Sequence, residues 1–325
     1  MKDEKEEPVL TCQQAESLVA EQRRLQREEL RGSSRDMRRW SAGDPAKLEV
    51  AQRAAGAVGL ILSEGNLRRA DSVLPDTGPY LEAKLGNRGP AVKLRPDDFW
   101  FQEAIWKIAM GTCSLVGPDL VLTAKHCIEG DLLDRVPEGK ICVVFDFEDQ
   151  VDNRPRSVFC KDHSVFRLCE VVDKGPDPKT PKDASEAKDD WILFRLDRAP
   201  SGRPHLVVDR EAIVPNRTVF TLGHSFGMTM RFARTEGVNF DNAPPGCFRV
   251  AVEAFNGASG SPVLDQDTGK IVGVVTGTPV GYLDGMLRTS CGGLLTPLCI
   301  PPWASRGTLA VSSANYCSQV LEYHH

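Results

Sequence analysis

The chain of 325 residues has no long hydrophobic run. A membrane-spanning helix needs about 18 or more mostly apolar residues in succession. The longest weakly polar stretch, 54–62, is far shorter and contains Gly56 and Gly59. We therefore expect no membrane span. The first seven residues, Met1 to Glu7, are highly charged and lack the apolar core of a secretory signal.

An excess of positive charge is also missing. The chain has 40 Lys and Arg against 45 Asp and Glu, which gives a formal net charge of −5. Nucleic-acid-binding proteins usually present a basic surface, so we expect no nucleic-acid partner. Internal repeats, low-complexity tracts and the Cys-x-x-Cys spacing of zinc sites are absent as well. We expect no metal site.

Cysteines, in contrast, are numerous. Ten cysteines in one chain favour disulfides and an oxidising compartment. Two interpretations stay open: a mature chain whose signal has been replaced by Met1, or a cytoplasmic protein with reduced thiols. The cysteine count favours the first, and so predicts a secreted or periplasmic protein.

Residues 1–78 differ in composition from the rest of the chain and predict a helical N-terminal extension. Residues 13–31 form one candidate helix. A second is expected over 44–65, with Asp44 as N-cap, Pro45 in the first turn and Gly65 as the C-terminal cap. The extension is expected to pack on the remainder of the chain, or to act as a pro-segment or interaction arm.

From residue 79 the sequence consists of short β-prone runs separated by turn residues, a spacing typical of β-sandwiches and barrels. A short terminal helix is expected over 312–321. The candidate strands are 105–109, 120–123, 141–147, 166–172, 191–196, 219–222, 248–254, 262–264 and 271–276.

The segment 256–262 reads Asn-Gly-Ala-Ser-Gly-Ser-Pro. A serine hydroxyl becomes a useful nucleophile only with a base beside it and backbone N–H groups placed to bind an oxyanion. Gly257 and Gly260 flank Ser259 and allow the chain to turn tightly around it. The segment therefore makes Ser259 a candidate nucleophile.

Two upstream segments supply the partners that such a serine needs. His126 follows the apolar run 120–123, so it is expected just past the end of a buried strand. Asp190 directly precedes the apolar run 191–194 and is preferred over Asp189 for that reason. The order along the chain is therefore His, Asp, Ser.

That order, with these flanking residues, resembles the chymotrypsin-like serine peptidases over about 95–320, and most closely their bacterial, glutamyl-endopeptidase-like branch. Residues 257–263 and 223–227 match two turns of that branch. The resemblance implies a mainly β fold of two six-stranded antiparallel β-barrels in a domain at 79–325. The barrels are expected at about 95–198 and 199–325.

The resemblance also implies residue roles. Ser259 would attack the scissile carbonyl, His126 would act as base and then acid, and Asp190 would orient His126. The N–H groups of Gly257 and Ser259 would form the oxyanion hole. A disulfide between Cys113 and Cys127 would hold the loop behind the histidine. The substrate would be a protein or peptide, and no cofactor is required.

Three departures from the family pattern are expected to matter. Ala258 replaces the aspartate that binds the freed N-terminal amine of animal enzymes, so that activation mechanism cannot operate. Lys125 replaces a small residue, and is expected to point into solvent or else to lower the pKa of His126. The run 274–276 lacks the histidine of glutamate-selective members.

Specificity rests on four further residues. Glu253 lies six residues before Ser259, at the spacing of the acid at the base of the pocket in trypsin-like enzymes, and so favours basic substrates. Thr276, Gly277 and Thr278 would offer main-chain groups to an extended substrate strand.

His224 is expected to be structural, and His163 and His205 to lie on the surface.

The sequence thus supports a serine endopeptidase, with two alternatives. One is a catalytically silent binding or adaptor protein that uses the fold as a scaffold. The other is a latent protease that is held inactive by residues 1–78.

Overall fold

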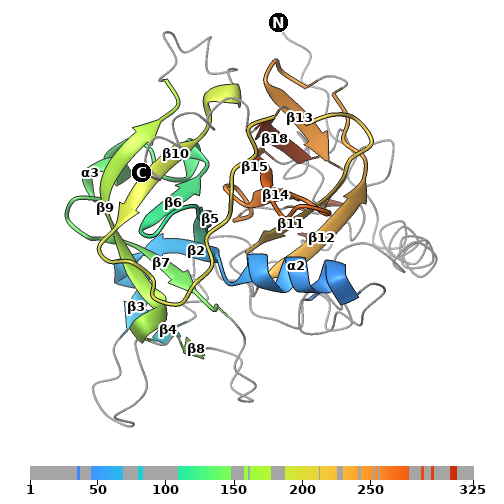
Figure 1. Ribbon diagram of the computed structural model, residues 1–325. Coiled ribbons are helices and arrows are strands. Elements are labelled where there is room, and N and C mark those ends of the chain that lie inside the picture. The colour runs from blue at the N-terminus through green and yellow to red at the C-terminus, as the bar shows by residue number, and fades with distance from the viewer. Residues whose placement is uncertain are drawn as a thin grey trace, which may run out of the picture.

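The computed structural model describes the two lobes of the molecule and the segments that join them (Figure 1). The residues that it describes are 35–36, 45–68, 80–82, 109–147, 157–159, 162–176, 187–211, 213–224, 230–240, 243–250, 252, 254, 257–277, 287–288, 294–295 and 308–312. The predicted helix over 13–31 lies outside these ranges, as does all but the first residue of the predicted terminal helix.

One lobe is a closed barrel of six antiparallel strands in the order β10-β6-β5-β2-β7-β9. Strands β6, β7 and β10 consist almost entirely of buried apolar residues, as expected where side chains fill a small barrel. The strands are β2 (Val58–Ser63), β5 (Ala109–Leu115), β6 (Leu120–Thr123), β7 (Ile141–Phe145), β9 (Val165–Lys174) and β10 (Ile192–Leu196).

The helix expected over 44–65 is wrong in its second half. Helix α2 (Pro45–Ala55) ends at Ala55, and β2 begins three residues later. Gly65 lies in a short 3-10 helix, η2 (Glu64–Asn66), rather than at the end of an α-helix. Apart from Gly59, the run from Val58 to Leu62 is β-branched or aliphatic and fully buried. Pairing with both β5 and β7 decides its conformation.

The second lobe is a sheet of seven strands in the order β1-β12-β11-β14-β15-β18-β13, which is open within the described residues. Beyond β12, Asn239 exchanges two backbone hydrogen bonds of 2.8 and 2.7 Å with Arg249 at the opposite edge. The strands are β1 (Arg35–Asp36), β11 (Thr218–Gly223), β12 (Arg231–Glu236), β13 (Cys247–Val250), β14 (Pro262–Asp265), β15 (Ile271–Gly277) and β18 (Thr308–Ser312).

The remaining elements are short. Strands β3 (Leu67–Arg68), β4 (Tyr80–Glu82) and β8 (Ser157–Phe159) form a small sheet, and β16 (Leu287–Arg288) pairs with β17 (Leu294–Leu295). The other helical segments are α3 (Asp131–Asp134), η4 (Lys125–Cys127), η5 (Asp162–Ser164) and η7 (Ala187–Asp189). The described part of the fold is therefore mainly β, as the sequence predicts.

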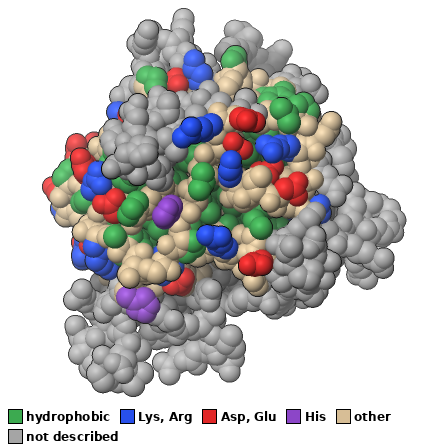
Figure 2. All heavy atoms as spheres, viewed as in Figure 1, with side chains coloured by type: hydrophobic (Ala, Val, Ile, Leu, Met, Phe, Trp, Pro, Cys, Tyr) green, Lys and Arg blue, Asp and Glu red, His purple; other side chains and the backbone are tan. Residues whose placement is uncertain are grey.

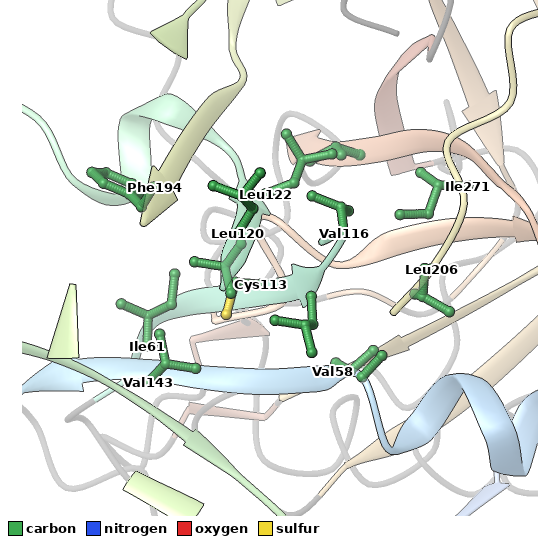
Figure 3. Close-up of a cluster of buried hydrophobic side chains, with 14 of the residues drawn as sticks. Val58, Ile61, Cys113, Val116, Leu120, Leu122, Val143, Phe194, Leu206 and Ile271 are labelled. Atoms are coloured by element: carbon green, nitrogen blue, oxygen red, sulfur yellow. The ribbon is translucent and has the colours of Figure 1, made fainter. Parts of the chain in front are cut away.

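One hydrophobic core extends from the barrel interior to the contact between the lobes (Figure 3). It joins Ile61 and Val143 of the barrel to Leu206, between the lobes, and to Ile271 of β15. Helix α2 adds the buried residues Ala51 and Ala54 to the same cluster. The chain from α2 to β2 thus packs on both lobes and helps to fix their relative position.

No helix in the described ranges is both long enough and apolar enough to cross a membrane. Figure 2 shows acidic and basic side chains interspersed over the visible face, with no broad patch of one sign among the described side chains. This distribution agrees with the small net charge of −5.

Candidate active site

His126 and Asp190, which lie 64 residues apart, form a direct hydrogen-bonded pair. The imidazole Nδ1 lies 2.6 Å from Asp190 Oδ2, and the backbone N–H of His126 donates to Oδ1 over 2.9 Å. An ionised carboxylate only accepts hydrogen bonds, so Nδ1 carries a proton, and in the neutral imidazole Nε2 keeps its lone pair. One carboxylate thus fixes both the position and the tautomer of His126.

Strand pairing explains why these two residues meet. Strands β6 and β10 run antiparallel, with Thr123 opposite Ile192. His126 lies three residues beyond Thr123, in η4, and Asp190 lies two residues before Ile192. The end of one strand and the start of the other therefore meet at the same edge of the barrel.

The environment of His126 favours its protonated form. Burial acts to lower the pKa, but the hydrogen bond and the charge of Asp190, with a smaller contribution from Glu129, raise the pKa of His126 above its ordinary value of 6.5. The side chain keeps 39% of its surface exposed, so the imidazole remains accessible from outside. The group therefore suits proton transfer near neutral pH.

Ser259 lies in a tight turn whose two glycines both have positive φ, 93° at Gly257 and 84° at Gly260. Other residue types adopt this conformation rarely, which explains the glycines. The N–H of Ser261 donates to the carbonyl of Ala258 over 2.9 Å, and the N–H of Gly260 donates to Val275 over 2.7 Å. These bonds fix the turn on β15, with Ser259 only partly buried.

The turn also contacts the barrel beside the histidine. The Thr112 N–H donates to the carbonyl of Ser259 over 2.8 Å. A Cβ on Gly260 would lie 2.1 Å from Thr123 Oγ1 and 3.1 Å from the backbone nitrogen of Ala124, so there is no room for any side chain. Ala124 is two residues from His126. The fold therefore brings the segments of Ser259 and His126 into direct contact.

The expected disulfide between Cys113 and Cys127 is wrong in this structure, because both residues are free thiols. The residue that faces Cys127 is Gly111, on which a Cβ would lie 2.5 Å from Cys127 Sγ. Cys113 instead points into the aliphatic core (Figure 3). Burial raises the pKa of Cys113, and raises that of Cys127 to about 12, as expected for thiols in an apolar environment.

Lys125 does not simply point into solvent. Its ammonium donates to the carbonyl of Gly175 over 3.1 Å and to that of Pro176 over 2.7 Å. Gly175 in turn donates its N–H to Trp191 over 2.9 Å and packs against the backbone of Asp189. The alternative expectation, a lowered pKa of His126, is also wrong, because that pKa is raised.

The other predicted histidines lie where the sequence places them. His224 is fully buried, donates its backbone N–H to Thr112 Oγ1 over 3.1 Å and packs edge-on against Phe147. His163 and His205 are exposed. In the described ranges no group of His, Cys, Asp or Glu side chains is placed to hold a metal ion.

Two of the predicted substrate-binding residues are described. Thr276 and Gly277 end β15, beyond Val274, where the pairing of β15 with β14 stops. Both are partly exposed, and Gly277 pairs with β18 on the other side. Glu253 and Thr278 lie outside the described residues.

Sequence reasoning missed the contributions of Gly111 and Thr112. Both lie in β5, where the run 109–115 mixes small and polar residues and lacks the alternation that marks a strand. The only available signal was a Gly-Thr pair close upstream of the histidine segment. Such a pair is too common in proteins to indicate a functional position by itself.

A six-stranded β-barrel with a carboxylate-bound histidine at its edge, packed against a second β-sheet lobe, is the arrangement of the chymotrypsin class. A family model described as the trypsin-like peptidase domain matches residues 111–274, about half of the chain. The chain therefore belongs to the trypsin-like peptidase family.

Solved structures similar to this chain include a Glu endopeptidase, with 14% identity, a TM-score of 0.44 and coverage of 68% of this chain and 87% of the other. The human heparin binding protein has 14% identity and a TM-score of 0.47, covering 83% and 92%. A serine endoprotease from Yersinia pestis has 11% identity and a TM-score of 0.45, covering 87% and 68%. No curated protein sequence gives a significant match.

Proposed function

We propose that this chain is a serine endopeptidase in which Ser259, His126 and Asp190 form the catalytic triad. The observation that supports it best is the pair of hydrogen bonds that His126 donates to the Asp190 carboxylate. With Nδ1 bound to Asp190, Nε2 is the nitrogen that can accept a proton, which a general base for a serine requires. Membership in the trypsin-like peptidase family supports the same conclusion.

In the proposed reaction, Ser259 Oγ attacks the scissile carbonyl as His126 Nε2 takes its proton. Asp190 stabilises the imidazolium that forms, and the N–H groups of Gly257 and Ser259 bind the oxyanion. His126 then gives the proton to the leaving amine. Water attacks the acyl-enzyme by the same route and releases Ser259. These steps need no cofactor.

A fluorophosphonate probe, which reacts covalently with activated serines, tests the proposal. We expect wild-type protein to be labelled and Ser259→Ala not to be. A peptide library should be cleaved by the wild type, with turnover falling on the order of 10⁶-fold in Ser259→Ala. Absence of labelling in correctly folded wild-type protein would instead favour a scaffold that binds partners without catalysis.

We further propose that the substrate binds as an extended strand along Thr276 and Gly277. Their side of β15 is free of β14, and main-chain hydrogen bonds could add a substrate strand there. Glu253 at the base of the pocket would then favour Arg or Lys before the cleaved bond. In the library, Glu253→Gln should lose that preference without losing cleavage of other sequences.

The arrangement of the strands supports a second barrel and restricts how residues 1–78 could keep the protease latent. We infer that the second lobe curls toward a second barrel, because Asn239 and Arg249 join its two edges. If residues 1–78 hold the protease inactive, the part that is removed or displaced on activation cannot include β2, because β2 is a strand of the barrel. A secreted or periplasmic location stays a prediction, and the described cysteines, all free, give it no support.

A further inference from the structure

The turn around Ser259 lacks the aspartate that anchors this turn in the animal enzymes of the chymotrypsin class. Ala258 occupies the position of the aspartate and is buried, so no salt bridge to a freed N-terminal amine can order this turn. An oxyanion hole nevertheless needs N–H groups held in place before the reaction begins. Some other group must therefore fix the turn in this chain.

Thr112, in β5 of the barrel, has the required contacts. It is completely buried, and all its hydrogen-bonding groups are used. Its N–H donates to the Ser259 carbonyl over 2.8 Å, and its hydroxyl donates to the Gly257 carbonyl over 2.8 Å. The same hydroxyl accepts from the His224 N–H over 3.1 Å, and the Thr112 carbonyl accepts from Thr123 Oγ1 over 2.7 Å.

These contacts determine how the peptide planes of the turn are oriented. Thr112 binds the carbonyls of Gly257 and Ser259, and Ser261 N–H binds the carbonyl between them, that of Ala258. In a trans peptide the N–H points opposite to the C=O. Because the Ala258 carbonyl is turned toward Ser261, the Ser259 N–H of the same peptide points the other way. Thr112 binds the carbonyls of the two peptides on either side of this one, and so fixes the planes that flank the Ser259 N–H.

We propose that Thr112 is a positioning residue that orders the oxyanion turn from the barrel side, so that the site is formed without any freed N-terminus. The inference rests on the proposed peptidase function. It also assigns the buried Gly223–His224 turn a role, because the His224 N–H fixes the orientation of the Thr112 hydroxyl.

The test compares Thr112→Val, which has nearly the same shape but no hydroxyl, with Thr112→Ser, which keeps it. Removing one contribution to an oxyanion hole typically lowers kcat about 10²- to 10³-fold. We expect Thr112→Val to lower kcat by on the order of 10²-fold with little change in KM. We expect kcat of Thr112→Ser to stay within a few-fold of the wild-type value. The affinity for a peptide boronic acid should fall in Thr112→Val in parallel with kcat.

Thr221→Val is a matched control. Thr221 is also a buried threonine on a strand, β11, and its hydroxyl has no hydrogen-bond partner in the described structure. Its replacement should leave kcat and boronic-acid affinity unchanged. If Thr112→Val does not fold, Thr112→Ala, which leaves space for a water molecule, takes its place in the series.

Two further measurements separate this inference from the proposed function. In a Ser259→Ala background, which needs no activity, amide exchange at residues 257–261 should speed up with Thr112→Val and not with Thr221→Val. Full-length chain with an acetylated N-terminus should react with the fluorophosphonate probe as fast as unblocked chain. Equal labelling of Thr112→Val and wild type, or labelling only after the N-terminus is cut, overturns the inference. A failure of wild type to label overturns the proposed function instead.

Discussion

At the scale of single residues, the site depends on one carboxylate that binds a histidine twice. The flanking patterns predict a strand end or a tight turn at His126, Asp190 and Ser259, and the structure brings His126 and Asp190 into contact. The catalytic role of Ser259 stays a prediction. What the motifs could not give is the raised pKa of His126, which depends on its hydrogen bond to Asp190.

Replacing Asp190 tests that dependence. In wild type the acid limb of kcat/KM should lie above 6.5, because the base must be neutral and its pKa is raised. Asp190→Asn removes the charge and one acceptor, so this limb should move to lower pH, while kcat falls on the order of 10⁴-fold. The pH profile measures both effects. An unchanged acid limb would show that Asp190 does not set the pKa.

The same pair predicts the sign of a stability effect. Because the folded-state pKa of His126 is raised, protonation of His126 stabilises the folded chain at low pH, and this contribution disappears as pH rises through the raised pKa. Asp190→Asn should therefore lose stability mainly below that pKa, as seen by denaturant unfolding at several pH values.

Lys125 gives a second prediction at this scale, because it connects the histidine segment to Gly175 beside Asp190. Lys125→Met keeps the length of the side chain but removes the donor. We expect kcat/KM to fall on the order of tenfold through displacement of the His126–Asp190 pair. Lys125→Arg should retain most activity. The downfield Nδ1 proton resonance of His126, followed in Ser259→Ala, should weaken only in Lys125→Met.

At the scale of elements, the sequence was most informative where strands are uniformly apolar. The run 120–123 forms β6 over the predicted residues, and β14 and β15 extend their predicted ranges by only one residue. The misjudged elements include β2 and β5, and no strand was predicted from the sequence at β12 or β18. Val58 and Ile61 fit a helical pattern as well as a strand, and only pairing partners far along the chain decide between the two.

Element geometry also explains the incorrect disulfide and allows a correct one. Spacing along the sequence selected Cys113, but the path of β5 places Gly111 against Cys127. A Cβ at Gly111 would lie 3.1 Å from the Cβ of Cys127, which is closer than the mean of about 3.8 Å for disulfides and just below the lower end of their range, about 3.5 Å. A small backbone shift would therefore permit the bond.

We expect Gly111→Cys to form a disulfide with Cys127 under oxidising conditions. Closing a loop of about this length stabilises a protein by roughly 3 kcal/mol, less any strain. The thermal midpoint should rise on oxidation and fall on reduction. In Gly111→Cys combined with Cys127→Ser, the redox dependence should vanish. Two thiols that stay reactive after oxidation would contradict the placement of Gly111.

At the scale of the whole molecule, the proposed active site belongs to neither lobe alone. The barrel supplies His126, Asp190 and Thr112, while the second lobe supplies the Ser259 turn. The chain from α2 to β2 contacts both lobes, since Ala51 and Ala54 pack in the core that also contains Ile61 and Ile271. Sequence composition placed the start of the β domain at residue 79, but β2 (Val58–Ser63) already belongs to the barrel. Composition could not show this, because the strand stands out only through its pairing with β5 and β7.

This arrangement predicts different outcomes for two truncations. Removing residues 1–43 leaves α2 and β2 intact, and the only described element lost is β1, two residues at the edge of the second sheet. That form should fold and react with the fluorophosphonate probe. Removing residues 1–78 deletes β2 and leaves the facing edges of β5 and β7 unpaired, so the barrel should not close. Far-UV circular dichroism and probe labelling would distinguish the two. A folded, labelled protein that lacks residues 1–78 would show that β2 is dispensable and that the whole region is a removable pro-segment.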